Sequence, residues 1–248
     1  MIKVEIFEMI NYRTRYFYHK RLERVFMKIA LINENSQKDK NEFIYKILNK
    51  VASKYGHEVY NYGVSNDKEC SIDYVGAGIL AGLLLNSKAV DFVITGCASG
   101  IGVTMSLNAM PEVYGGYVAD SVDAKLFCKV NAGNAIAIPF GKYFGTGSEF
   151  LLEGIFETLF STEFLSGYPA KRKEIQSLQK QELIHLKQTT QIAMSEILEE
   201  LDKDMLKDMI YNEYFEEHFF KNCDNEFLGI LVKNIFDEWE NIEESELN

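Results

Sequence analysis

Short apolar runs alternate with helical patterns along the chain from Lys28 onward. Five of these runs are rich in β-branched or aromatic residues and close on a polar or small residue, which is typical of β-strands. The predicted strands cover residues 28–33, 58–63, 91–95, 114–120 and 135–139. The predicted helices cover residues 41–55, 73–86, 101–110, 121–129 and about 147–160. Strands that alternate with helices in this way predict a parallel sheet with helices on both faces.

The composition changes after the segment SGYPAKRKEI at residues 166–175. Residues 180–240 carry apolar side chains at helical spacing, contain no proline and a single glycine, and have a surplus of Glu and Asp. We therefore predict a Rossmann-like three-layer α/β domain with a five-stranded parallel sheet at residues 27–176, and an acidic helical appendage at residues 177–248. The aromatic stretch YNEYFEEHFF within the appendage is expected to pack into a core instead of forming a ligand site.

Residues 1–26 are basic and aromatic, with neither the apolar segment nor the small-residue cleavage site of a secretory signal. The sequence MKIALIN at Met27 has the character of the first strand of an α/β domain. We interpret residues 1–26 as an N-terminal extension or as the product of a misassigned start codon.

Composition narrows the classes of partner. The chain has 26 lysines and arginines against 37 aspartates and glutamates, a net charge of −11, which argues against binding to nucleic-acid phosphates. No apolar run reaches the roughly 18 to 20 residues of a membrane-spanning helix, so we expect a soluble protein. The four cysteines show no paired spacing and the four histidines are scattered. We expect no disulfide scaffold, no bound metal and a cytoplasmic location.

One glycine-rich turn carries candidate chemistry. The segment AVDFVITGCASGIGVTMSLNA, residues 89–109, predicts a buried strand, a turn that includes Gly100 and Gly102, and then a helix. Cys97 lies at this turn, where free N–H groups and the helix dipole favour negative charge. The alternative is that Cys97 is a small buried apolar residue. The hydroxyl of Ser99 and the amides of the turn favour a thiol base beside an oxyanion site.

A dinucleotide-binding loop is a weaker interpretation of the same turn. Its pattern is G-x-x-x-G-x-G instead of G-x-G-x-x-G, Met105 occupies the third glycine position, and the loop follows the third predicted strand. We therefore predict no cofactor.

The segments MKIALIN, GHEVYNYG, Asp73–Tyr74, CASGIGVTMSLNA and NAGNAIAIP occur in this order within residues 27–175. In order and spacing they resemble the type B ribose-5-phosphate isomerase and galactose-6-phosphate isomerase family. In that family the loop cysteine moves a proton between C1 and C2 of an open-chain sugar, while a hydroxyl and backbone amides hold the enediolate oxygen. The resemblance implies that Cys97 is the base and that Ser99, Gly100 and Gly102 surround the oxygen.

The resemblance also implies substrate contacts beyond the turn. Asn108, Asn131 and Asn134 match asparagines of the family's site, although each is also explained as a loop or cap residue. Where the family has Asp-His after its first strand, this chain has Glu34 and Asn35. Asn35, Asn108 and Asn131 are the predicted substrate-binding asparagines.

Other departures from the family concern the groups that open a furanose ring and bind a phosphate. Val130 replaces the ring-opening histidine, and Tyr168 and Pro169 replace an arginine–histidine pair. Losing these donors would cost a phosphate dianion about 1.5 to 3 kcal/mol of binding free energy for each charged hydrogen bond. Lys142, which stands about where the family has a strand-end arginine, is predicted to bind a carboxylate instead.

Within this superfamily, MKIALINENSQ, AVDFVITGC, NAGNAIAIP, SGYP and YFEEHFFKNC resemble the ketol-isomerases that act on 4-deoxy-L-threo-5-hexosulose uronate. The resemblance implies a metal-independent aldose–ketose isomerase of uronate catabolism. It would convert this linear uronate to 3-deoxy-D-glycero-2,5-hexodiulosonate in a homodimer whose site lies at the interface. A pentose or hexose phosphate isomerase stays open, if basic residues such as Lys171 and Arg172 converge on the site. A non-catalytic sugar-binding or regulatory module also stays open.

Overall fold

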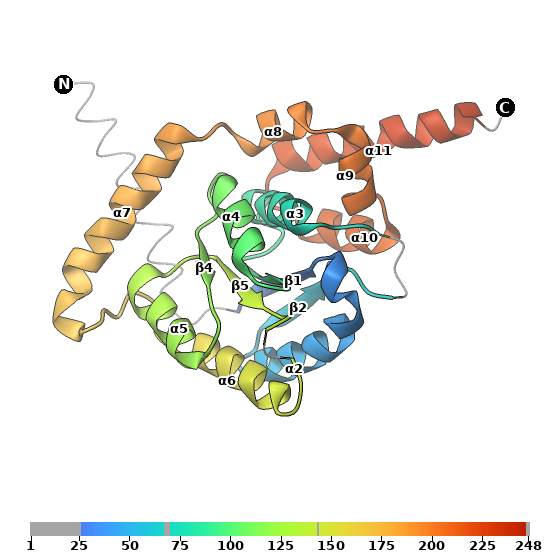
Figure 1. Ribbon diagram of the computed structural model, residues 1–248. Coiled ribbons are helices and arrows are strands. Elements are labelled where there is room, and N and C mark those ends of the chain that lie inside the picture. The colour runs from blue at the N-terminus through green and yellow to red at the C-terminus, as the bar shows by residue number, and fades with distance from the viewer. Residues whose placement is uncertain (1–25, 67–69, 143, 247–248) are drawn as a thin grey trace, which may run out of the picture.

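The computed structural model describes residues 26–66, 70–142 and 144–246. At its centre lies one parallel sheet of five strands in the order β2-β1-β3-β5-β4 (Figure 1). The strands are β1 (Lys28–Asn33), β2 (Glu58–Asn61), β3 (Phe92–Cys97), β4 (Gly115–Tyr117) and β5 (Ala135–Pro139). The predicted five-stranded parallel sheet is confirmed, whereas the predicted N-terminal extension lies outside the described residues except for Phe26.

Helices cover both faces of the sheet, as the prediction of a Rossmann-like three-layer sandwich requires. One face packs against α2 (Asn41–Lys54), α5 (Ser121–Leu126) and α6 (Ser148–Ser161), and the other against α3 (Tyr74–Asn86) and α4 (Ile101–Ala109). Successive strand residues point to opposite faces. Ile29 and Leu31 of β1 accordingly join the core of α2 and α6, while Ala30 and Ile32 join the core of α3 and α4.

Three predicted elements end at least two residues earlier than their apolar patterns suggest. The strand predicted over residues 58–63 ends at Asn61. The strand predicted over residues 114–120 ends at Tyr117, and the side chain of Asp120 instead caps α5 by accepting from the backbone N–H of Val122 at 2.8 Å. The helix predicted over residues 121–129 ends as α5 at Leu126 and continues as a π-helical segment, η2 (Phe127–Asn131).

The C-terminal part is helical, as predicted. It comprises η3 (Ala170–Arg172), α7 (Lys173–Thr190), α8 (Met194–Glu200), α9 (Lys203–Ile210), α10 (Glu213–Asn222) and α11 (Glu226–Glu246). Figure 1 shows α8 to α11 gathered around α3, while α7 lies apart on the side of β4 and α5. The boundary predicted between residues 176 and 177 falls inside α7, which crosses it without interruption.

The appendage covers a helix that is apolar around its whole circumference. All nine residues of α3 from Gly76 to Leu84 are buried. Met209 of α9 lies so close to Gly76 that an added Cβ would come within 2.7 Å of its sulfur. Phe215 and Phe219 of α10 stack with ring centroids 4.8 Å apart and belong to the same core as α3. Helices α9 and α10 therefore complete the core of the α/β domain.

The connections of the central strands diverge at one edge of the sheet. From β1 the chain continues through η1 (Asn35–Lys40) into α2 on one face, and from β3 it continues into α4 on the other face. Because β1 and β3 are neighbours, their loops diverge at the carboxyl edge. Ligands of open α/β sheets bind at such topological switch points.

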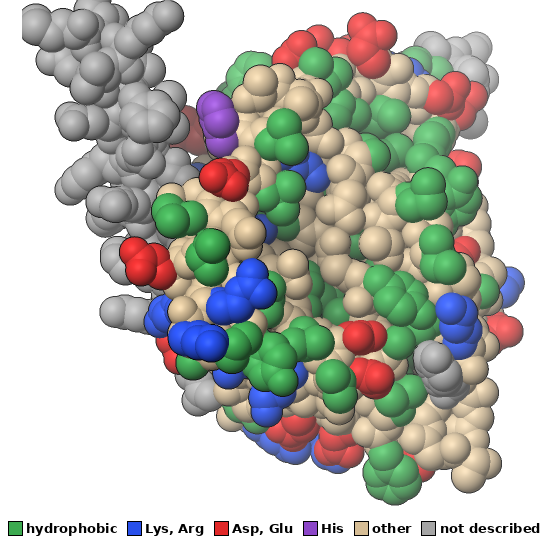
Figure 2. Space-filling model, turned by 60° about the vertical axis from the view of Figure 1, so that its left-hand side comes forward, with side chains coloured by type: hydrophobic (Ala, Val, Ile, Leu, Met, Phe, Trp, Pro, Cys, Tyr) green, Lys and Arg blue, Asp and Glu red, His purple; other side chains and the backbone are tan. Residues whose placement is uncertain are grey.

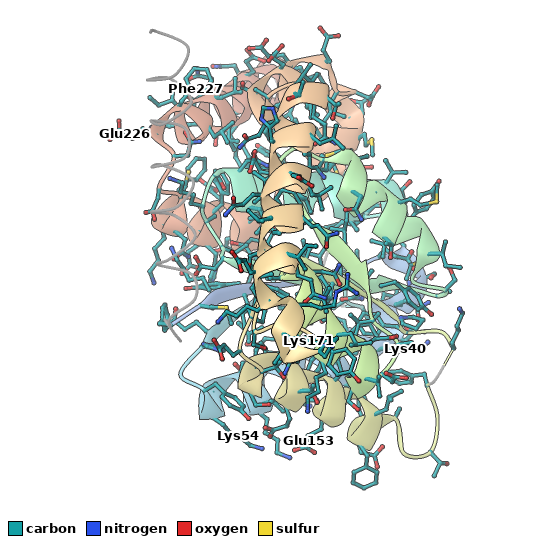
Figure 3. All side chains as sticks on the ribbon, turned by 90° about the vertical axis from the view of Figure 1, so that its left-hand side faces the viewer. Lys40, Lys54, Glu153, Lys171, Glu226 and Phe227 are labelled. Atoms are coloured by element: carbon teal, nitrogen blue, oxygen red, sulfur yellow. The ribbon has the colours of Figure 1, made fainter. Side chains whose placement is uncertain are left out.

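Replacing Phe219 by Ala is expected to lower the free energy of unfolding by about 3 to 5 kcal/mol, because the ring is fully buried and its loss leaves a cavity. Phe227 of α11, which is 66% exposed and projects outward in Figure 3, is the matched control. Phe227→Ala should change the unfolding free energy by no more than about 0.5 kcal/mol. Urea unfolding measures both, and equal stabilities would contradict the role of α10 in the core.

Candidate active site

Cys97 is the last residue of β3 and lies at the carboxyl edge of the sheet, with 7% of its surface exposed. Its Sγ accepts a hydrogen bond from the backbone N–H of Gly100 at 3.2 Å. The Oγ of Ser99 lies 4.0 Å from this sulfur and accepts from the backbone N–H of Ile101 at 3.2 Å. The turn therefore holds a thiol and a hydroxyl side by side at the start of α4.

Two glycines allow the chain to make this turn. A Cβ on Gly96 would lie 2.3 Å from the carbonyl oxygen of Ile138 and 2.4 Å from the ring of Phe140, so only glycine fits between the two strands. Gly100 adopts a left-handed conformation with φ of 74°, and a Cβ there would lie 2.9 Å from the ring of Tyr117. These constraints fix where Sγ points.

Two backbone amides of the turn form hydrogen bonds within the chain. The N–H of Gly100 donates to Sγ of Cys97, and the N–H of Ile101 donates to Oγ of Ser99. Gly102 lies in the first turn of α4, where backbone N–H groups lack partners within the helix. An oxygen bound beside Ser99 would therefore meet the hydroxyl and the N-terminal end of α4.

The carboxyl end of β1 brings two further polar residues to this edge of the sheet. Asn35 is exposed, but its side chain is engaged with the segment before α3. Its Nδ2 donates to Ser71 Oγ, and its Oδ1 accepts from the N–H of Ile72, both at 3.0 Å. Glu34 is buried and caps η1 by accepting from the backbone N–H of Ser36 at 2.9 Å. Asn35 thus lies at the carboxyl edge of the sheet, as predicted, and its side-chain amide holds the segment that contains Ser71 and Ile72.

Two lysines lie at the same edge. Lys142 is exposed, and its Nζ donates to the hydroxyl of Tyr117 at 3.3 Å. The ring of Tyr117 also lies next to Gly100. Lys40 donates to the carbonyl oxygen of Phe140 at 3.0 Å, and burial lowers the pKa of this lysine. Lys40 and Lys142 therefore both lie near the end of β5 at the carboxyl edge.

The predicted asparagines Asn108, Asn131 and Asn134 lie at the opposite edge. Val93 pairs with Ala135 at the start of β5, and Cys97 pairs with Pro139 at its end. Four residues of strand separate the two edges by about 13 Å. Asn131 and Asn134 precede Ala135, and Asn108 hydrogen-bonds both backbone groups of Gly115 at the start of β4. One chain does not bring these asparagines together with Cys97.

The side chains of Asn108 and Asn134 each connect backbone segments through hydrogen bonds. Asn108 ties the end of α4 to β4, and Asn134 accepts from the N–H of Tyr114 at 2.7 Å and donates to the carbonyl of Glu112 at 2.8 Å. The exposed Asn131 ends η2 and lines a cavity.

This cavity, of about 540 Å³, runs along the edge strand β4, and residues of α7 line its other side. Its walls include Asn131, Tyr117, Leu183 and two lysines of α7. Lys180 Nζ lies 3.8 Å from the ring centroid of Tyr114, and Lys187 Nζ donates to the carbonyl oxygens of Asn108 and Val113. Burial lowers the pKa of Lys187 to about 8. Figure 2 shows this face, with basic and apolar side chains around a hollow.

Tyr168 and Pro169, which the sequence analysis aligns with an arginine–histidine pair of the family, lie at the amino edge of the sheet. The loop that carries Tyr168 is anchored there, since the N–H of Gly167 donates to the carbonyl of Lys129 at 2.9 Å. Lys171 and Arg172 are exposed on η3, and Figure 3 shows Lys171 at the start of α7. These two cations do not converge on Cys97 of the same chain.

Glu34 and Lys40 also lie at the candidate site, although no sequence motif indicates them. Both follow β1, and Glu34 continues the alternation of Ala30 and Ile32 toward the face of Cys97. That alternation is visible in the sequence, whereas the contact between Lys40 and Phe140, which are 100 residues apart, is not. Across the described ranges no group of three or more His, Cys, Asp or Glu side chains could hold a metal ion. None of the described helices is long and apolar enough to cross a membrane.

A family model described as Ribose/Galactose Isomerase matches residues 29–177, and one described as Ribose-5-phosphate isomerase matches residues 189–235. The chain belongs to the ribose/galactose isomerase family and is a sugar isomerase. No curated protein matches it.

Solved structures agree with this assignment. A 4-deoxy-L-threo-5-hexosulose-uronate ketol-isomerase complexed with a tartrate is 46% identical, with a TM-score of 0.83 over 85% of this chain and 100% of that one. A ribose-5-phosphate isomerase from Vibrio parahaemolyticus is 39% identical, with a TM-score of 0.82 over the same shares of the two chains. The type B ribose 5-phosphate isomerase of Leishmania infantum, 19% identical, shares the fold with a TM-score of 0.57 over 67% of this chain and 100% of its own.

Replacing Gly100 by Ala is expected to destabilise the protein by about 1 to 3 kcal/mol for the left-handed conformation alone, with a further loss from the contact with Tyr117. Gly56 is the matched control, because it has φ of 77° and a Cβ added there would meet no atom within 4 Å. Denaturant unfolding should show a larger loss for Gly100→Ala than for Gly56→Ala. Equal losses would mean that Tyr117 does not constrain the turn.

Proposed function

We propose that the protein isomerises 4-deoxy-L-threo-5-hexosulose uronate to 3-deoxy-D-glycero-2,5-hexodiulosonate without a metal ion, with Cys97 as the base. The observation that carries the proposal is the fixed thiol and hydroxyl of Cys97 and Ser99 at the switch point of the sheet. The 46% identity to a ketol-isomerase for this uronate supports the choice of substrate. That relative was crystallised with tartrate, a hydroxylated dicarboxylate, which supports a site for a linear carboxylate.

The reaction needs a proton to move from C2 to C1 of the open chain. Sγ of Cys97 takes the proton from C2, and the electron pair forms an enediolate whose oxygen lies beside Ser99 and the start of α4. The thiol then returns the proton to C1, which completes the ketose. Positioned proton transfer contributes about 10²- to 10⁴-fold to such rates, and each oxyanion donor roughly 2.7 to 4 kcal/mol.

The far carboxylate of this substrate needs a single cation. Lys142 is exposed at the carboxyl edge and reaches the hydroxyl of Tyr117, the residue that adjoins Gly100. A lysine binds a carboxylate as a point charge and demands less geometry than a bidentate phosphate clamp. We assign Lys142 to this contact.

A second copy of the chain would complete the site. Asn131 lies at the opposite edge of the sheet from Cys97, so it contacts the same substrate only if it comes from another chain. The outer face of α4, next to the turn, exposes Ile101 and Met105, which are 56% and 71% exposed. Exposed apolar side chains beside a half-built site support a homodimer whose interface includes α4.

Wild-type protein is expected to convert the uronate and to give a much lower kcat/KM with ribose 5-phosphate or galactose 6-phosphate. The physical reason is that Val130, Tyr168 and Pro169 supply neither a ring-opening base nor charged donors to a phosphate. Chromatography of product formation measures all three substrates. Cys97→Ser is the inactive reference, and Cys223→Ser, on the appendage, should keep wild-type activity. A higher kcat/KM for either phosphate would replace the uronate proposal with the sugar-phosphate one.

Met105→Asp is expected to produce monomers, because a charge on the outer face of α4 cannot be buried cheaply in an interface. Phe150 on α6 is the matched control, since it is equally apolar and 73% exposed but lies on the other face of the sheet. Light scattering after size exclusion should show a dimer for wild type and Phe150→Asp only. A dimeric Met105→Asp would contradict the placement of the interface on α4.

A further inference from the structure

Glu34 directly follows β1, and Cys97 is the last residue of the neighbouring strand β3. Asn33 of β1 pairs with Gly96 of β3, so the next residues along the two strands are Glu34 and Cys97. Glu34 keeps an extended backbone, with φ of −86° and ψ of 173°, and therefore continues the alternation of β1. By the alternation of an extended chain, its Cβ points to the same face as Ala30 and Ile32, which is also the face of Cys97. The register therefore places Glu34 next to Cys97 at the carboxyl edge of the sheet.

The carboxylate of Glu34 is held firmly in this position. Its two oxygens accept from the backbone N–H and the hydroxyl of Ser36. That hydroxyl also accepts from Gln37 Nε2 at 2.7 Å, and Gln37 Oε1 accepts from Lys40 Nζ at 2.6 Å. Glu34 itself is only 7% exposed. A carboxylate offers about four acceptor positions, so two remain for a ligand at the carboxyl edge.

The isomerisation requires two proton transfers, and Cys97 performs only the one between the carbons. The hydroxyl proton on O2 must leave as the ketone forms, and O1 must gain a proton as the aldehyde becomes an alcohol. A carboxylate that reaches both oxygens can take the first proton and deliver it to the second without any net change in its own charge. Glu34 is a carboxylate that the register of the sheet places next to Cys97.

We propose that Glu34 carries the oxygen-bound proton from O2 to O1 while Cys97 carries the carbon-bound proton from C2 to C1. The O2–H bond breaks as O1–H forms through Glu34, and the C2–H bond breaks as C1–H forms through Cys97. No electron acceptor is needed, because the C2–H electron pair becomes the enediolate and then the new C1–H bond. This inference rests on the proposed aldose–ketose isomerisation and makes Glu34 a catalytic residue for it.

The test is Glu34→Gln, which keeps an oxygen to accept from the N–H of Ser36 but cannot relay a proton. In heavy water, kcat should fall by about 10²- to 10⁴-fold, with KM little changed. Deuterium should still enter C2 of recovered substrate, because Cys97 continues to form and reverse the enediolate. Glu42→Gln, an exposed carboxylate of α2 paired with Lys46, is the matched control and should behave like wild type.

The outcomes separate this inference from the proposed function. Exchange at C2 without turnover in Glu34→Gln supports the relay, and the loss of both in Cys97→Ser supports the base. Wild-type kcat in Glu34→Gln, or equal loss of exchange and turnover in a folded variant, would overturn the relay. Failure of the wild type to convert the uronate would overturn the proposed function instead. Should Glu34→Gln not fold, Glu34→Asp keeps the carboxylate, and full loss of turnover with exchange also lost would contradict the relay.

Discussion

The hydrogen bond from the Gly100 amide to the sulfur of Cys97 is the contact on which the candidate site depends. It exists because β3 passes so close to β5 that Gly96 has no room for a side chain, and because Gly100 then reverses the chain in a left-handed conformation. The ring of Tyr117 closes over Gly100 from β4 and links the turn to Lys142. A thiol, a hydroxyl and a helix N-terminus are thereby fixed at one point of the carboxyl edge.

The rest of the molecule keeps that point in place. The strand order places β1 beside β3. Because Asn33 pairs with Gly96, the next residues, Glu34 and Cys97, lie next to each other. Behind the turn, α3 is buried on every side because α9 and α10 cover the face that the sheet does not. The appendage thus extends the core on the side of α3, while α7 stands over the cavity at β4.

The sequence was most informative where a pattern repeats over several residues. Periodicity placed the strands and the helices around the sheet, and the glycine turn singled out Cys97 and Ser99. Within one chain Asn108 and Asn131 lie about 13 Å of strand away from the thiol, so their predicted place in the same site depends on a second chain, which periodicity does not show. It also passed over Lys40, because only the folded chain brings that lysine to Phe140. The strand pattern continues to Asp120, but the side chain of Asp120 caps α5, and β4 ends earlier, at Tyr117.

Substrate is proposed to bind against the sulfur of Cys97. A thiol-alkylating reagent, followed by peptide mass spectrometry, measures which cysteine is modified as activity disappears. Loss of activity is expected to follow modification of Cys97 one for one, and the uronate should slow both. Cys128, which is fully buried and whose pKa burial raises to about 12, should stay unmodified in the folded protein. Full activity in protein whose Cys97 is completely alkylated would contradict the account.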